Sequence, residues 1–183
     1  MSSFYTPDEL KTLGLGSYGE NVLISRYASL YGAGNMHFGN NVRIDDFCIL
    51  SGKIIMGNYI HISAYTGIWG GDSGVVLEDY SGISSRCAVY AESDDFSGKG
   101  MTNPMLPDEL RNVIHGEVIL KKHVLVGSGC TVLPGVTIGE GSSVGSMSLV
   151  KHSLAPWGVY AGIPCNRIKE RDKNLLNLES LLF

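Results

Sequence analysis

The sequence predicts an all-β fold, a parallel solenoid built from six-residue repeats of a short strand and a turn. From residue 120 to 150 an aliphatic side chain recurs at every sixth position, and a small or β-branched residue stands four positions later. Neither the helical period of 3.6 nor strand alternation produces a period of six. Coils repeated on successive faces do, and each buries its apolar edge against its neighbours. The aliphatic positions are Leu120, Val126, Val132, Ile138, Val144 and Val150, and the small ones are Val124, Cys130, Val136, Ser142 and Ser148.

The same period runs backwards through residues 18–89, with two interruptions. Two extra residues fall between Leu30 and Phe38, and three between Ile68 and Leu77; both insertions contain glycines and are predicted to bulge as loops. Glycine-rich hairpins are the alternative structure, but the register, unbroken over residues 120–150, favours the solenoid. About eighteen repeats, three to a coil, predict about six coils and a prism ~30 Å tall. We therefore expect one domain, with coils over residues 18–89 and 118–165.

Both ends of the chain predict short helices. Within residues 1–16, Thr6 can act as the N-cap, Pro7 occupies the first helical position, Glu9 completes a capping box and the helix ends near Gly14. Residues 167–183 carry leucines at roughly helical spacing with charges between them. Such helices would cap the open ends of the solenoid and block edge pairing.

One segment, residues 90–117, does not follow the period. It contains two prolines, several acidic residues and a histidine, and leaves the solenoid after Val89. Loops of this length inside a compact domain are usually functional. We expect this inserted loop to form the acceptor site.

Composition limits the partners and the location. The chain is 44% hydrophobic, and its net charge of −4 argues against a nucleic-acid partner. No apolar run approaches membrane length, and residues 1–12 lack the apolar core of a signal peptide. Cys48, Cys87 and Cys130 fall on small inward positions, and no CxxC pair exists, so the cysteines are interpreted as packing residues. Reduced thiols indicate a cytoplasmic protein.

The repeats and the tail together resemble the hexapeptide-repeat acyltransferases, in particular the maltose and galactoside O-acetyltransferase group. The tail reads PGVTIGEGSSVGSMSLV and then APWGVYAGIPCNRIK, in which Ala161, Gly162, Ile163 and Pro164 match the AG-x-P turn of that group. The resemblance covers residues 18–169. It implies a left-handed parallel β-helix, a homotrimer, and transfer of an acetyl group from acetyl-CoA to a hydroxyl or amino group of a sugar. A nucleotide sugar or a surface-glycan precursor is the expected acceptor. No metal cofactor is expected.

The resemblance also implies where the coenzyme binds. In the family it lies in the groove between neighbouring prisms, and a face of small residues lets the pantetheine arm approach closely. Basic side chains can meet its phosphates. The positions that match are Ser128, Gly129, Ser146, Lys151, Gly162, Pro164, Asn166, Arg167 and Lys169. His123 is expected beside this groove.

The catalytic position departs from the family pattern. There a histidine in a Tyr-x-x-x-His-Pro context acts as general base, whereas here the stretch is YAESDD and Asp94 occupies the place of the histidine. Four interpretations stay open: Asp94 or Asp95 is the base, it pairs with His115 or with a histidine of a neighbouring subunit, the acceptor is an amine, or activity is lost. Mutual repulsion of nearby acids is expected to raise a carboxyl pKa toward useful basicity.

Acceptor binding is assigned to four further residues. Tyr65 replaces the acceptor-contacting asparagine of the family, so galactoside specificity is not carried over. His61 should point outward beside Tyr65. Tyr90 and Glu92 stand at the start of the inserted loop.

Three other functions compete with sugar acylation. An antibiotic acetyltransferase shares the fold, but favours a loop histidine. A zinc lyase needs three histidines, two of them five residues apart, whereas His115 and His123 are eight apart. A non-catalytic trimeric scaffold would not bind coenzyme A.

Overall fold

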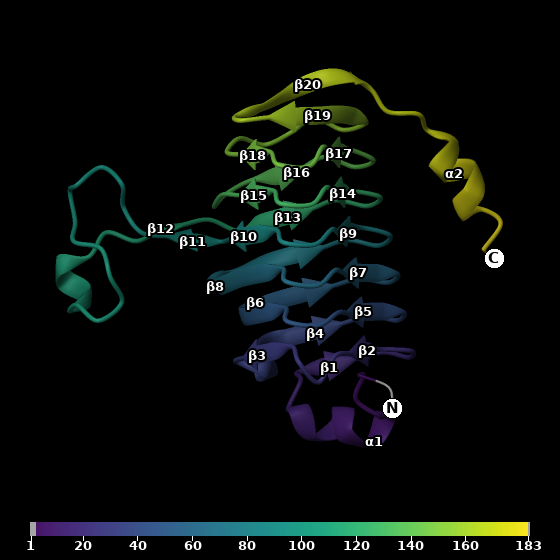
Figure 1. Cartoon of the computed structure of the whole chain (residues 1–183), viewed down its shortest axis with the longest axis horizontal. Coiled ribbons are helices and arrows are strands. Elements are labelled where there is room, and N and C mark those ends of the chain that lie inside the picture. Colours follow the sequence, from purple (N-terminus) through teal and green to yellow (C-terminus); the bar gives the residue numbers. More distant parts are fainter. Residues whose placement is uncertain (1–2, 183) are drawn as a thin grey trace.

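The structure, a computed structural model that describes residues 3–182, is a left-handed parallel β-helix of about seven turns (Figure 1). The predicted number of coils, six, is therefore one too few, because the repeat count stopped at Val150 and left out the strand at residues 158–162 of the last coil. The coils stack from the N-terminal end to the C-terminal end, and the long inserted loop and the C-terminal helix leave the prism on opposite sides (Figure 1).

Two large sheets form the faces of the prism. The ten-stranded sheet contains β1 (Ser17–Tyr18), β3 (Ser29–Tyr31), β4 (Met36–Phe38), β6 (Ile49–Met56), β8 (Gly67–Leu77), β10 (Ala88–Tyr90), β13 (Val118–Leu120), β15 (Thr131–Val132), β16 (Thr137–Ile138) and β18 (Leu149–Val150). The eight-stranded sheet contains β2 (Leu23–Ile24), β5 (Val42–Ile44), β7 (Ile60–Ile62), β9 (Gly82–Ile83), β14 (Leu125–Val126), β17 (Ser143–Val144), β19 (Gly158–Gly162) and β20 (Cys165–Glu170).

The predicted aliphatic positions form the core in vertical columns. In the eight-stranded sheet one column pairs in register from coil to coil and is buried throughout: Ile24, Ile44, Ile62, Ile83, Val126 and Val144. The small positions, such as Cys130 and Ser142, are buried as well. Tyr18 and Leu30 are only partly buried, since they lie near the end of the stack. The hexad register is thereby confirmed.

The two insertions differ in structure. The first contains a short 3₁₀ turn, η2 (Ala33–Asn35), as a loop would. The second, between Ile68 and Leu77, is not a loop: it lies inside β8, which pairs with β6 through two register shifts. Because β6 and β8 continue through a corner, two faces of the prism belong to one sheet.

The N-terminal cap follows the sequence closely. In α1 (Pro7–Leu10) the Glu9 amide donates to Thr6 Oγ1 at 3.4 Å, and the Thr6 amide donates to Glu9 Oε2 at 2.8 Å, so the capping box is confirmed. A 3₁₀ turn, η1 (Lys11–Leu13), follows and ends at Gly14 with φ 70°. Residues 1–2 of the predicted segment lie outside the described residues.

The C-terminal end differs from the helix expected over residues 167–183. Its first part is β20, which turns back antiparallel on β19, and helix α2 spans only Asn174–Glu179. The hairpin covers the open edge of β19, which is the protection that a solenoid end requires. Leucine spacing could not reveal this strand.

The inserted loop is anchored by an antiparallel stem. Strands β11 (Glu92–Ser93) and β12 (Ile114–His115) pair outside the prism, and η3 (Asp108–Leu110) lies within the loop. The loop projects away from the coils (Figure 1).

Candidate functional site

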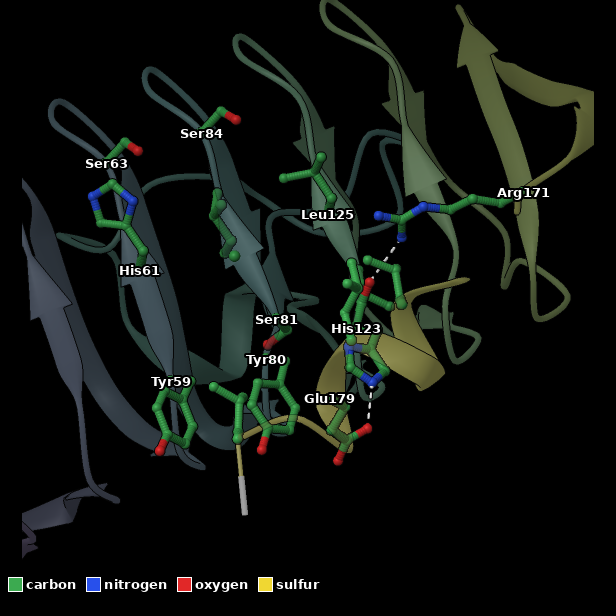
Figure 2. A pocket seen from close by; sticks show the side chains of 16 residues that line it. Tyr59, His61, Ser63, Tyr80, Ser81, Ser84, His123, Leu125, Arg171 and Glu179 are labelled. Carbon is green, nitrogen blue, oxygen red and sulfur yellow. Dashed lines mark hydrogen bonds and ion pairs between the residues drawn. The ribbon is translucent and has the colours of Figure 1, made fainter. Parts of the chain in front are cut away.

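A pocket of about 550 Å³ lies on the outer face of the eight-stranded sheet. Strands β7, β9 and β14 form its floor, and α2 with the segment before it forms one wall (Figure 2). Its lining includes His61 and two serines, Ser63 directly after β7 and Ser84 directly after β9. Ser81 also lines it, and its hydroxyl oxygen, which is buried, has no hydrogen-bond partner among residues 3–182.

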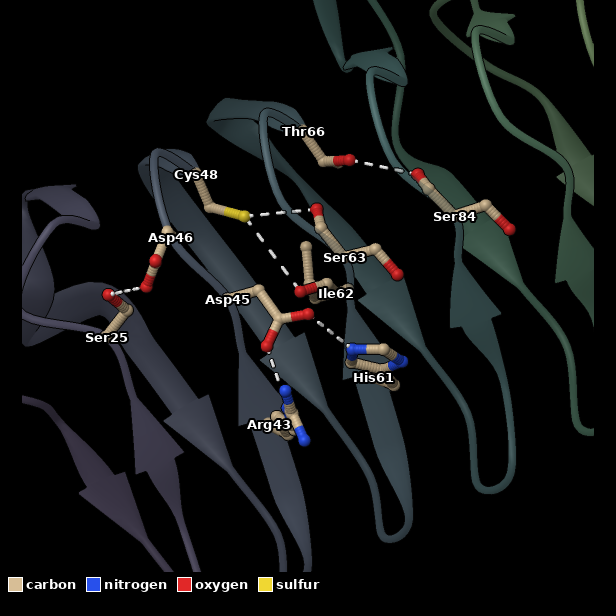
Figure 3. A network of polar contacts seen from close by, with 10 residues as sticks. All are labelled: Ser25, Arg43, Asp45, Asp46, Cys48, His61, Ile62, Ser63, Thr66 and Ser84. Atoms are coloured by element: carbon tan, nitrogen blue, oxygen red, sulfur yellow. Dashed lines mark hydrogen bonds and ion pairs between the residues drawn. The ribbon is translucent and has the colours of Figure 1, made fainter. Parts of the chain in front are cut away.

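A carboxylate bridges two side chains at the edge of this face. Asp45 Oδ2 lies 2.8 Å from His61 Nε2, and Oδ1 accepts a hydrogen bond of 2.7 Å from Arg43 Nε (Figure 3). Burial raises the pKa of the Asp45 carboxyl, but these two hydrogen bonds outweigh it and hold the pKa below its usual range. Asp45 is therefore ionised at neutral pH.

Ion pairs attach α2 to the prism. Glu179 lies 2.8 Å from His123 Nε2 and 2.6 Å from Lys122 Nζ, and Arg171 donates to the carbonyl oxygen of His123 at 2.8 Å. His123 is buried and stacks on Tyr80. It therefore lies under α2 in the pocket wall, at a different corner of the prism from Ser128 and Gly129.

The loop residues form a second group. His115 Nδ1 lies 3.2 Å from Glu92 Oε1 across the stem, and Glu92 also accepts the Asp72 amide at 2.9 Å. Asp94 is 40% exposed, and its ion-pair partner is Arg111, at 3.9 Å from Nη2 to Oδ1. In the described part of the chain, Asp94 and His115 thus contact other side chains and not each other.

Asp95 holds a turn of the loop together. Its carboxylate accepts hydrogen bonds from the Ser97 hydroxyl at 2.8 Å, the Ser97 amide at 2.7 Å and the Asn112 amide group at 3.2 Å. These bonds, those from Ser97 first, hold the pKa of Asp95 far below its usual range. At Asp95, crowding by the neighbouring acids does not raise the pKa, because hydrogen bonds to the charged form outweigh repulsion. A carboxylate so saturated is a poor base.

The remaining predicted acceptor residues lie apart. Tyr90 stacks on Trp69, with ring centroids 4.7 Å apart, where the loop leaves the prism. Tyr65 stacks on Phe47 at 5.0 Å, and this aromatic ladder occupies an exposed corner of the N-terminal coils. Of the four residues assigned to acceptor binding, only His61 lines the large pocket.

The predicted coenzyme residues fall into two neighbouring sets. Ser128, Gly129 and Ser146 lie at one corner of the C-terminal coils, where the Met147 amide donates to the Ser128 carbonyl oxygen at 2.8 Å. Gly129, whose φ is 73°, stacks between Arg86 and Met147, which adopt the same left-handed conformation with φ 60° and 58°. A Cβ at Gly129 would lie 2.5 Å from Met147 Sδ, so a larger residue there would have to displace that side chain.

The second set belongs to the terminal hairpin. Gly162 and Pro164 lie in its turn, and the Gly162 amide donates to Ser148 Oγ at 3.0 Å. The basic and amide side chains lie exposed on β20 or just after β18: Lys151, Asn166, Arg167 and Lys169. The hairpin thus places three of these polar residues on the strand that caps the last coil.

Sequence reasoning missed the serines of the pocket and the contribution of α2. The hexad register does place Ser63 and Ser84 on the outer face, each directly after a buried isoleucine. A serine on an outer face carries no signal of its own, however. The wall formed by α2 depends on a contact between residues 56 apart, Glu179 and His123, which no local pattern contains.

A parallel β-helix with an inserted loop and a small-residue corner defines the hexapeptide-repeat transferase class. Residues 117–152 match the family described as bacterial transferase hexapeptide (six repeats). The chain is 46% identical over 176 residues to a dTDP-4-amino-4,6-dideoxy-D-glucose acyltransferase of Escherichia coli, covering 94% of this chain and 91% of the relative. The chain belongs to the hexapeptide-repeat sugar acyltransferases, and is an acyl-CoA-dependent enzyme.

A solved structure and a second relative in sequence agree with this assignment. AntD, an N-acyltransferase from Bacillus cereus crystallised with dTDP and 3-hydroxybutyryl-CoA, is 51% identical, with a TM-score of 0.98 over 100% of this chain and 97% of that chain. The putative lipopolysaccharide O-acetyl transferase WbbJ of Escherichia coli is 26% identical over 166 residues, covering 90% and 76% of the two chains. In residues 3–182 no group of side chains suits a metal ion, and no helix is long and apolar enough to cross a membrane.

Proposed function

We propose that this enzyme transfers an acyl group from acyl-CoA to the amino group of a dTDP-linked 4-amino-4,6-dideoxyglucose. The observation that carries the proposal is the 46% identity, over nearly the whole of both chains, to an acyltransferase named for that sugar. AntD, at 51% identity, is an N-acyltransferase with structures containing dTDP and coenzyme A. An amine acceptor also accounts for an aspartate at position 94, because an amine needs less help from a base than a hydroxyl does.

The acyl group can be larger than acetyl. AntD binds 3-hydroxybutyryl-CoA, and the pocket beside Ser63 and Ser84 includes leucine side chains of α2, among them Leu175 and Leu178. Apolar side chains beside hydroxyls suit an acyl chain that carries a hydroxyl. Acetyl-CoA and a 3-hydroxyacyl-CoA are therefore both candidate donors.

The site is proposed to be shared between subunits of a homotrimer. Asp94 directly follows β11 of the stem, which projects from the prism (Figure 1), whereas Ser84 lies on the outer face of the coils. Structures of AntD variants D94A and S84A, with coenzyme A bound, show that both positions were studied in that enzyme. This chain has Asp94 and Ser84 at the same numbers. A neighbouring prism would bring its pocket to the loop.

Product analysis tests the proposal. The purified chain is incubated with dTDP-4-amino-4,6-dideoxyglucose and either acetyl-CoA or 3-hydroxybutyryl-CoA, with free thiol and product mass measured together. We expect thiol release matched by one acyl group added to the nucleotide sugar. Thiol release without an acylated sugar would contradict the proposal. Sedimentation of an active, stable monomer would contradict the trimer.

A further inference from the structure

The Asp45–His61 contact sets which nitrogen of the imidazole carries the proton. Asp45 is ionised and can only accept, so His61 Nε2, at 2.8 Å from its oxygen, is the donor. In the neutral imidazole Nδ1 is then an acceptor with a free lone pair. No hydrogen bond to Nδ1 is found within residues 3–182, and the side chain is 51% exposed.

That free nitrogen is directed toward the pocket. His61 lies on β7 opposite Gly82 of β9, so it is next to the coil that carries Ser84, two residues further along. One ring nitrogen points to Asp45 and the other is turned to the side of the face on which Ser84 lies (Figure 3). Neighbouring strands are ~4.8 Å apart, so a ligand on Ser84 is within reach of His61.

Asp45 is itself fixed by more than His61. Arg43 Nε donates to its second oxygen at 2.7 Å, and the Arg43 guanidinium lies 5.3 Å from the ring centre of Phe4. The Asp45 side chain is only 18% exposed. A carboxylate held from both sides can orient an imidazole, as in carboxylate–histidine pairs of other active sites.

The reaction requires a proton acceptor near the amine. When an amine nitrogen attacks a thioester, the C–N bond forms, the C–S bond breaks and the nitrogen must lose a proton. Asp95 is saturated with hydrogen bonds. His115 has one nitrogen on Glu92, as His61 has one on Asp45, but it lies on the projecting stem and does not line the pocket. Two imidazoles line the pocket, and each has one nitrogen on a carboxylate. His123 is buried under α2, whereas the His61 side chain is 51% exposed, so His61 is the one that a substrate can reach.

We propose that His61 Nδ1 accepts the proton released by the acceptor amine, and that Asp45 is the positioning residue that keeps this nitrogen free. The inference rests on the proposed function and names a step within it. The sulfur leaves as a thiolate, the proton passes from nitrogen to His61, and His61 returns it to the sulfur. The products are an amide and free coenzyme A, and His61 is neutral again.

Several other charged and titratable groups face His61. Asp45 and Arg43 approach from β5 and the turn after it, and Tyr59 precedes β7. Across the pocket, Tyr80, His123, Arg171 and Glu179 face the same space (Figure 2). The pH profile of the wild-type rate is therefore compared with the profiles of variants at His61 and Asp45.

Rates across pH with dTDP-4-amino-4,6-dideoxyglucose and acyl-CoA test the assignment. In His61→Gln we expect kcat at pH 7 to fall about 10²–10⁴-fold, the usual contribution of a general base, with the KM for acyl-CoA unchanged. The limb of the pH profile that reports imidazole protonation should vanish. Asp45→Asn should lower kcat and move that limb, the double variant should lose little more than His61→Gln, and Asp45→Glu should restore part of the rate.

His37→Gln, an exposed histidine of the N-terminal coils, is the matched control and should keep the wild-type rate and profile. A His61→Gln rate within about threefold of wild type, with the acid limb intact, would overturn the inference. Should that variant not fold, His61→Asn and Asp45→Asn carry the same test, with coenzyme A binding as the check of folding. If the wild type acylates no amino sugar, the proposed function fails and the inference fails with it.

Discussion

His115 Nδ1 and Glu92 Oε1 lie 3.2 Å apart across the stem of the inserted loop. Glu92 also accepts the Asp72 amide at 2.9 Å, so one carboxylate joins both strands of the stem to the prism. A pair more than half exposed at the histidine contributes little to global stability. Its effect should be local, on the direction in which the loop leaves the coils.

Glu92→Gln should loosen the stem without unfolding the chain. We expect faster amide hydrogen exchange at residues 92–93 and 114–115, and a higher KM for the nucleotide sugar, because the loop then samples more orientations. Glu109→Gln, an exposed acid elsewhere in the loop, is the control and should change neither. Unchanged exchange in Glu92→Gln would show that β-pairing alone fixes the stem.

Asp94→Asn should act on acceptor binding more than on chemistry. A hydrogen bond to a charged group contributes ~1.5–3 kcal/mol, so losing the carboxylate should raise the KM for an amino sugar by about ten- to a hundredfold. The kcat should change little, because the amine proton has another acceptor. A fall in kcat of ~10²–10⁴ with unchanged KM would instead make Asp94 the base.

Asp95→Ala should disorder the loop. Its carboxylate joins residues 97, 100 and 112, so removing it frees several donors at once. We expect rapid proteolytic cleavage within residues 96–112 and loss of activity, with coenzyme A binding retained. Asp108→Ala, whose side chain is 96% exposed, is the control and should resist cleavage as wild type does.

The lowered pKa of Asp95 gives this loop a defined pH dependence. A group whose folded pKa is depressed contributes stability above its unfolded value, ~3.9, and loses it as the pH falls toward the folded value. Loop protection should therefore be full at pH 5 and decline below about pH 3.9 in wild type. In Asp95→Asn the loop should be less protected at pH 5, with no such decline.

Large side chains in the small-residue corner should block the coenzyme. Ser128→Trp and Ser146→Trp place an indole where the pantetheine arm is expected, while the inward columns stay intact. Both variants should lose the thermal shift that coenzyme A gives the wild type. Ser29→Trp, at the opposite end of the solenoid, should retain it. Full affinity in both corner variants would place the coenzyme elsewhere.

The fold was predictable because one local rule repeats. The core column from Ile24 to Val144 is readable from spacing alone, since every coil places its aliphatic residue against the coil before it. The β8 insertion and β20 were not readable, because a register shift and a reversed strand depend on which neighbours are left unpaired. Helical leucine spacing in 167–183 gave no sign of β20.

The site was predictable only in its parts. His61 and Glu92 could be named, but the partner of each is set by long-range pairing, Asp45 from the previous coil and His115 from the returning strand. The sequence left Asp95 open as a general base, whereas the hydrogen bonds that its carboxylate accepts in the folded loop lower its pKa and make it a poor proton acceptor. Short-range charge patterns do not include the donors that a folded loop supplies.

Two acceptors that differ only in the group on carbon 4 of the sugar distinguish acylation of nitrogen from acylation of oxygen. The chain is given acetyl-CoA with dTDP-4-amino-4,6-dideoxyglucose, or with the matching sugar that has a hydroxyl at carbon 4. We expect stoichiometric acylation of the amino sugar, with the acetyl group on the 4-nitrogen, and negligible turnover of the hydroxyl sugar. Equal or faster acylation of the hydroxyl sugar would contradict the proposed N-acyl transfer.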